Sequence, residues 1–133
     1  MKNTIMGNWF IGCGGLFGAV GVVSGAIGSH ILKTRLSSVE LEIFSNAVIY
    51  LLVHSAVLLV CGVVLAGNNN NRWFKYAGIL MVVGILLFCG GLMLRSVTGI
   101  PAYGTTAPIG GGALILAWLA IAVAGFAKLG QSR

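Results

Sequence analysis

The chain has 133 residues, of which 58% are hydrophobic and only 8% are charged, and its mean hydropathy is +1.02. Soluble domains carry about 25% charged residues, so this composition excludes a soluble globular protein and indicates an integral membrane protein. The net charge of +6 could suggest a nucleic-acid partner. However, the basic residues are scattered singly near the ends of apolar runs, as topology-setting charges are, so we expect no nucleic acid.

Four apolar runs lie near residues 8–30, 43–66, 73–94 and 107–127. Each is close to the roughly 20 residues that a helix needs to cross the hydrocarbon core of a membrane. Because little chain is left between them, we predict an all-α fold in a single domain, 1–133. This domain is an integral membrane four-helix bundle in up-down-up-down order.

The first run carries a regular series of glycines that a helix places on one face. Each interior glycine costs about 1 kcal/mol relative to alanine in a helix in water, whereas in lipid a face without side chains lets another helix approach closely. A cleaved signal peptide is the alternative, but the run continues to His30 and we expect a retained span. The predicted helix-packing glycines are Gly14, Gly18, Gly21, Gly25 and Gly28.

The second run contains a row of polar residues, Asn46, Tyr50 and His54, at positions i, i+4 and i+8 of a helix. A polar group at the depth of His54 is costly in hydrocarbon, so it should face the bundle interior and find a partner. One interpretation is a proton or ligand site. The other is a neutral histidine that donates to Tyr50, to a backbone carbonyl or to a neighbouring serine. With His30 at the end of the first span, these residues form the candidate polar site.

The polar segments between the runs predict where helices begin. Ser37 followed by Glu40 reads as a capping box at the start of the second helix. Residues 67–71 form a polar turn of glycine and asparagines. Thr106 as cap and Pro108 inside the first turn should start the last helix.

The fourth run repeats the small-residue pattern of the first. We therefore predict that spans one and four pack against each other, or against identical surfaces in a neighbouring copy, at a short interaxial distance. The small residues of this face are Gly110, Ala113, Ala117, Ala120, Ala124 and Ala127.

Groups able to do chemistry are few. The only carboxylates, Glu40 and Glu42, lie between the apolar runs, whereas small proton-coupled antiporters usually use an intramembrane acidic group. The two histidines should lie on the order of 15 Å apart in depth, which argues against a shared metal site. We expect no catalytic residue, no metal, no cofactor and no enzymatic activity.

The three cysteines form no Cys-x-x-Cys pair and are expected to be small apolar fillers without disulfides. They are Cys13, Cys61 and Cys89.

The basic residues predict the orientation in the membrane. Five of them lie on the side that holds both termini and three on the opposite side, so we expect both termini in the cytoplasm and the protein in a bacterial inner membrane. The first group is Lys2, Arg72, Lys75, Lys128 and Arg133, and the second is Lys33, Arg35 and Arg95.

Three phrases of the sequence, at 25–33, 44–54 and 107–111, resemble the small four-span bacterial membrane proteins of the domain of unknown function 423 family. The shared motifs are Gly-Ala-x-Gly-x-His, Tyr-x-x-x-His and Pro-Ile-Gly-Gly. The resemblance spans nearly the whole chain and implies a four-helix membrane fold, but it implies no activity.

Within these motifs the resemblance marks His30, Tyr50, His54 and Pro108 as positions of interest. The chain departs from the family pattern where Ala107 replaces a threonine. It also departs where Gly90-Gly91-Leu92-Met93 replaces Gly-Ser-Leu-Tyr.

Packing features outnumber reactive ones, so the leading hypothesis is a structural or accessory subunit. Such a subunit would bind lipid and other membrane protein subunits, or copies of itself, through its glycine and alanine faces. The alternative is a small transporter or channel that uses the Asn46, Tyr50 and His54 row. An enzyme acting on lipid, with a polar cluster near Arg95 and Tyr103, ranks third.

Overall fold

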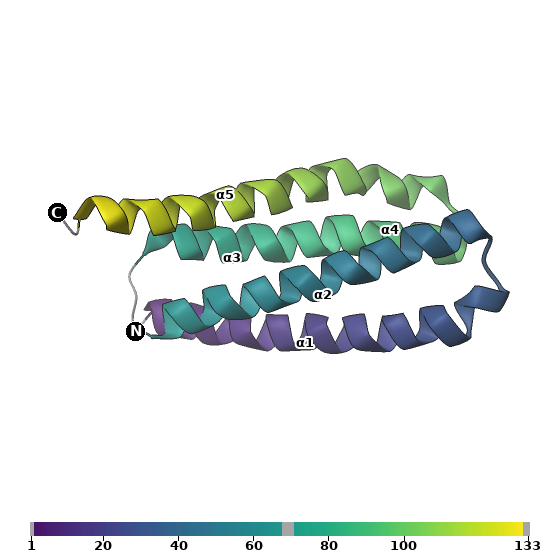
Figure 1. The fold of residues 1–133 in the computed structure, drawn as a ribbon, viewed down its shortest axis with the longest axis horizontal. Coiled ribbons are helices and arrows are strands. Elements are labelled where there is room, and N and C mark those ends of the chain that lie inside the picture. The colour runs from purple at the N-terminus through teal and green to yellow at the C-terminus, as the bar shows by residue number, and fades with distance from the viewer. Residues whose placement is uncertain (1, 68–70, 132–133) are drawn as a thin grey trace.

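A computed structural model describes residues 2–67 and 71–131, and every element in this part of the chain is helical (Figure 1). Four helical stretches are long and apolar enough to cross a membrane, which confirms the predicted all-α fold with four spans. Residues 68–70 of the predicted asparagine turn lie outside the described residues. The elements are α1 (Lys2–His30), η1 (Leu32–Thr34), α2 (Ser38–Ala66), α3 (Arg72–Gly84), η2 (Ile85–Gly90), α4 (Gly91–Thr98), η3 (Pro101–Thr106) and α5 (Ala107–Gln131).

Local sequence explains where α2 begins. The Ser37 hydroxyl accepts a hydrogen bond from the Glu40 N–H at 3.3 Å, and the Ser37 N–H donates to Glu40 Oε2 at 3.0 Å, so the predicted capping box is confirmed. The 29 residues of α2 extend about 43 Å at 1.5 Å per residue. This exceeds a hydrocarbon core of about 30 Å, so the capped end stands in the interfacial region.

The spans form two antiparallel hairpins, α1 with α2 and α3 with α5. Helices α2 and α3 lie between the other two, and α1 and α5 lie at opposite edges of the bundle (Figure 1). In the most apolar 18-residue window, 44% of α2 is buried but only 22% of α1. The outer helices therefore leave most of their surface available to lipid or to other proteins.

The prediction that the first and fourth spans pack against each other is wrong within one chain. The glycine face of α1 packs on α2 instead: a Cβ added at Gly14 would lie 2.9 Å from the side chain of Leu59, and one at Gly21 would lie 2.6 Å from Leu52. The physical reason is that a short connection between two long helices makes them antiparallel neighbours. The remaining glycines of this face, Gly18, Gly25 and Gly28, lie against Ser55, Val48 and Phe44.

The small-residue face of α5 packs on α3 and η2, the span that precedes it in the chain. A Cβ added at Gly110 would overlap the backbone nitrogen of Phe88, and one at Gly84 would lie 2.7 Å from Leu114 Cγ. The backbones thus approach closely at this crossing, as small residues allow. The buried small residues of this face are Gly110, Ala113, Ala117, Ala120 and Ala124.

The third span contains an element that the sequence did not predict, because residues 85–90 form one turn of π-helix, η2, between α3 and α4. Short π segments inside α-helices often occur at functional sites. Here the segment faces α5 and α2. It therefore lies between these two helices, and its Phe88 ring meets the Tyr50 ring of α2.

The prediction that the Thr106 side chain caps the last helix is wrong. A six-residue 3-10 turn, η3, leads directly into α5, and the Thr106 hydroxyl donates to Leu87 O at 2.8 Å and to Tyr103 O at 3.0 Å instead of accepting from the helix that follows. Pro108 does lie in the first turn of α5, as predicted. The η2 segment changes the pairing of nearby carbonyls, and the Thr106 hydroxyl satisfies one of them.

Replacing Thr106 with valine keeps the shape of the side chain but removes the hydroxyl donor to Leu87 O. We expect a loss of about 1 kcal/mol in the free energy of unfolding, measured by reversible unfolding in mixed micelles. Thr105→Val is the matched control, because the Thr105 hydroxyl bonds only within its own turn, to Ala102 O at 2.7 Å, and is exposed. An equal loss in both variants would contradict the role given to Thr106.

Candidate functional site

His54, near the middle of α2, is buried and has a hydrogen bond at each ring nitrogen. Its Nδ1 lies 2.6 Å from Tyr50 O, one turn earlier in α2, and its Nε2 lies 3.2 Å from Trp118 Nε1 on α5. An indole N–H can only donate, and a backbone carbonyl can only accept. The two partners therefore select the neutral imidazole that carries its proton on Nδ1.

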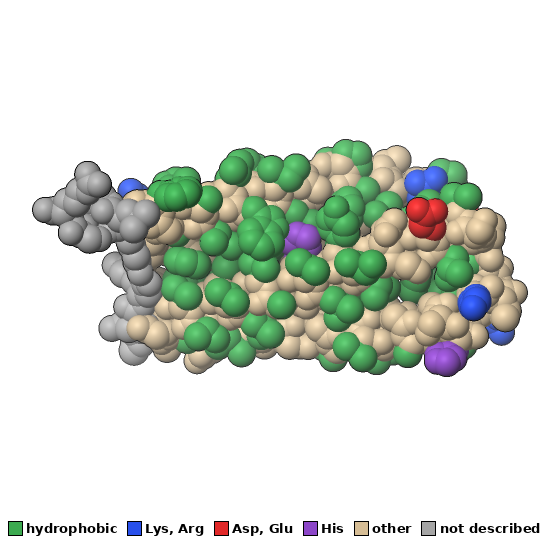
Figure 2. Space-filling model, in the orientation of Figure 1, with side chains coloured by type: hydrophobic (Ala, Val, Ile, Leu, Met, Phe, Trp, Pro, Cys, Tyr) green, Lys and Arg blue, Asp and Glu red, His purple; other side chains and the backbone are tan. Residues whose placement is uncertain are grey.

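Aromatic rings surround this histidine. The Tyr50 ring stacks on His54 with centroids 5.5 Å apart, and it also meets the Phe88 ring of η2 at 4.9 Å. The Trp118 ring approaches His54 edge-on at 6.2 Å. Figure 2 shows a histidine near the middle of the visible face, surrounded by hydrophobic side chains. His54 thus links α2 to α5 at the centre of the bundle.

A groove of about 420 Å³ lies beside these rings, between α2, η2 and α5. Gly111 forms part of its wall, within the run of three glycines at 110–112 near the start of α5. The Tyr50 side chain is 46% exposed, and within the described residues its hydroxyl has no hydrogen-bond partner. His54 is two residues from the midpoint of α2, so this groove opens at about mid-depth of the membrane.

The arrangement joins α2 to α5 through the contact between His54 and Trp118. Both ring nitrogens of His54 are engaged in hydrogen bonds. Among the described residues, no three His, Cys, Asp or Glu side chains gather as a metal site would require. The buried Cys61 and Cys89 fill apolar positions in the core clusters.

The structure brings together only part of the predicted polar site. Tyr50 and His54 share the groove, and the bond from His54 to a backbone carbonyl is one of the partners that the sequence suggested. Asn46 is exposed and does not line the groove, and His30 is exposed at the far end of α1. The main partner that sequence reasoning missed, Trp118, is 64 residues away, and no local spacing could have indicated it.

The outward surface of α1 carries a second series of small or short residues, which the sequence analysis did not single out. These positions recur at spacings of 3, 4, 3, 4 and 3 and lie about a third of a turn around the helix from the glycines that face α2. A Cβ added at Gly12 or Gly15 would meet nothing within 4 Å. We call this surface the outer stripe, and its residues, all exposed, are Gly12, Gly15, Ala19, Val22, Ala26 and Ser29.

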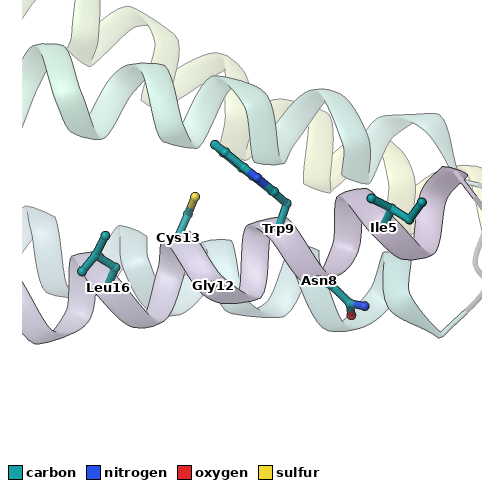
Figure 3. A pocket seen from close by; sticks show the side chains of 6 residues that line it. All are labelled: Ile5, Asn8, Trp9, Gly12, Cys13 and Leu16. Atoms are coloured by element: carbon teal, nitrogen blue, oxygen red, sulfur yellow. The ribbon is translucent and has the colours of Figure 1, made fainter.

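A shallow groove runs along the N-terminal part of this surface, lined by residues of α1 alone (Figure 3). In Figure 3 the Trp9 and Cys13 side chains project from one side of α1 and the Asn8 side chain from the other, and Gly12 leaves the helix backbone bare between them. Trp9 is 65% exposed. A bare backbone beside a large aromatic ring is a surface on which another helix can pack.

The four long, apolar helices define a multi-pass helical membrane protein with four spans. The family model described as "Protein of unknown function (DUF423)" matches residues 24–111, and the chain belongs to this family, which confirms the resemblance predicted from its motifs. No solved structure matches the chain.

The relatives in this family are bacterial membrane proteins of similar length. The UPF0382 membrane protein of Staphylococcus aureus (strain bovine RF122 / ET3-1) is 34% identical over 117 residues, which cover 88% of this chain and 94% of that protein. UPF0382 membrane protein YwdK of Bacillus subtilis is 34% identical over 115 residues, covering 86% of this chain and 94% of its own. A UPF0382 membrane protein of Staphylococcus haemolyticus is 32% identical over 121 residues, covering 91% and 98%.

Proposed function

We propose that this protein is a non-enzymatic accessory protein of the bacterial membrane, which packs through the outer stripe of α1 against a transmembrane helix of another subunit or of a second copy. The observation that carries the proposal is the exposure of all six positions of the stripe. The glycines that the sequence predicted for packing lie against α2 within the same chain. The surface of α1 that is available to a partner is therefore the outer stripe.

Small residues at helical spacing allow two backbones to approach in lipid, where helix association depends on close van der Waals contact. The open space beyond Gly12 and Gly15 means that no described residue of the same chain requires glycine there. A single glycine in a helix also costs up to about 1 kcal/mol relative to alanine. A partner helix gives these two glycines a use that the isolated chain does not.

The transport alternative receives less support from the same site. A relay through the polar row would pass through His54, yet its two hydrogen-bond partners are a backbone carbonyl, which only accepts, and an indole N–H, which only donates. Asn46, the third member of the row, lies outside the groove.

The test is crosslinking in intact bacterial membranes followed by purification of a tagged chain. We expect the wild type to yield a crosslinked species larger than the monomer. The Gly12→Leu and Gly15→Leu variants should yield less than half as much of this species. Gly112→Leu and Gly125→Leu are matched controls on α5, because added Cβ atoms there also meet nothing within 4 Å. A wild type that yields only monomer, or stripe variants that crosslink like the controls, would overturn the proposal.

A further inference from the structure

A polar pocket of about 280 Å³ lies where the start of α2, the end of α4 and the start of η3 meet. Glu40 comes from the first turn of α2, Arg95 and Ser96 come from α4, and Pro101 begins η3. Figure 2 shows acidic and basic side chains close together at this end of the molecule. Because α2 is longer than the hydrocarbon core is thick, its capped end lies at the depth of lipid headgroups.

The Glu40 carboxylate and the Arg95 guanidinium, the two charged groups of this pocket, are not paired with each other. Both bonds from Ser37 to the Glu40 carboxylate go to Oε2, so within the described residues Oε1 has no hydrogen-bond partner. The Arg95 guanidinium makes no hydrogen bond or ion pair with any described residue, and its stem lies against Gly104, where a Cβ would come within 2.7 Å of Arg95 Cδ. A cation and an anion thus share one pocket without pairing with each other.

We propose that this pocket binds the headgroup of a zwitterionic phospholipid that carries a primary ammonium, namely phosphatidylethanolamine. Arg95 donates to the phosphate, since guanidinium and phosphate form strong, paired hydrogen bonds. The free Glu40 Oε1 accepts from the ammonium, which has three N–H donors. Ile43, which also lines the pocket, faces the start of the acyl chains.

The charge pattern selects this headgroup over the two common alternatives. Phosphatidylglycerol brings a phosphate without a cation, so Glu40 would repel it. Phosphatidylcholine brings a quaternary ammonium that has no N–H to donate to Oε1. The site is independent of the outer stripe of α1, because it is built from α2, α4 and η3.

The experiment is native mass spectrometry of the full chain released from micelles that contain the three lipids with identical acyl chains in equal amounts. We expect phosphatidylethanolamine to be retained on the order of tenfold more than phosphatidylglycerol, which corresponds to one charge-assisted contact. Arg95→Gln should lower retention of both lipids. Gly104→Ala, which displaces the arginine stem, should lower it in the same direction.

Glu40→Gln is the decisive variant. Glutamine also serves at this position of a capping box, so the start of α2 is kept while the charge is removed. We expect the preference for phosphatidylethanolamine over phosphatidylglycerol to disappear. Glu42→Gln is the matched control, since it makes the same change in net charge at an exposed residue that does not line the pocket, and it should keep the preference.

Three outcomes would overturn the proposal. The first is equal retention of the three lipids by the wild type, as expected for lipid that only surrounds the bundle. The second is the same loss of preference in Glu42→Gln as in Glu40→Gln. The third is displacement of bound lipid by water-soluble glycerophosphoethanolamine, which would assign the pocket to a soluble compound.

Discussion

Replacing Gly110 with alanine is expected to lower the free energy of unfolding by about 1–3 kcal/mol, the usual cost of overpacking a close contact. The added Cβ would overlap the backbone nitrogen of Phe88 and lie 2.9 Å from the Leu87 backbone carbon. Backbone of a buried helix cannot move aside as the end of a flexible side chain can. Unfolding of the purified chain in mixed micelles, or steric trapping in bicelles, measures the effect.

The matched control lies two residues away on the same helix. A Cβ added at Gly112 meets nothing within 4 Å, so Gly112→Ala should be neutral or stabilising by up to about 1 kcal/mol, as alanine is the better helix former. Equal stability of the two variants would show that α5 does not pack on η2 as described.

Replacing His54 with alanine is expected to cost about 1–3 kcal/mol of stability, because it leaves the Trp118 indole N–H without its acceptor. The side chain is also buried, so its loss removes contacts with the Tyr50 ring. Trp118→Phe removes the donor while keeping an aromatic ring. The same unfolding assay measures both single variants and the double variant.

The double variant separates the bond between His54 and Trp118 from the loss of packing. If the bond at 3.2 Å stabilises the bundle, the double variant should lose less stability than the sum of the two single losses, by about 0.5–1.5 kcal/mol. Tyr76→Phe, which changes an exposed ring near the start of α3, should leave the stability within about 0.5 kcal/mol of the wild type. Strict additivity of the His54 and Trp118 variants would contradict a direct bond.

Local features of the fold were predictable because they depend on residues close together in the sequence. The capping box needs only Ser37 and Glu40, three positions apart, and both bonds are present. The depth of His54 follows from its place in an apolar run, and its bond to a carbonyl one turn away is local as well. The π segment at 85–90 was not predictable, because it depends on contacts with α5 and on the Thr106 hydroxyl 19 residues after Leu87.

The number of spans and their membrane character follow from the sequence alone, because hydropathy is a property of consecutive residues. The sequence also determined that α1 and α5 carry faces able to pack closely. Which helix each face meets became known from the three-dimensional arrangement, since spacing along one helix carries no information about its partner. For that reason the glycines of α1 lie against α2, the alanines of α5 lie against α3, and a second stripe on α1 is left exposed.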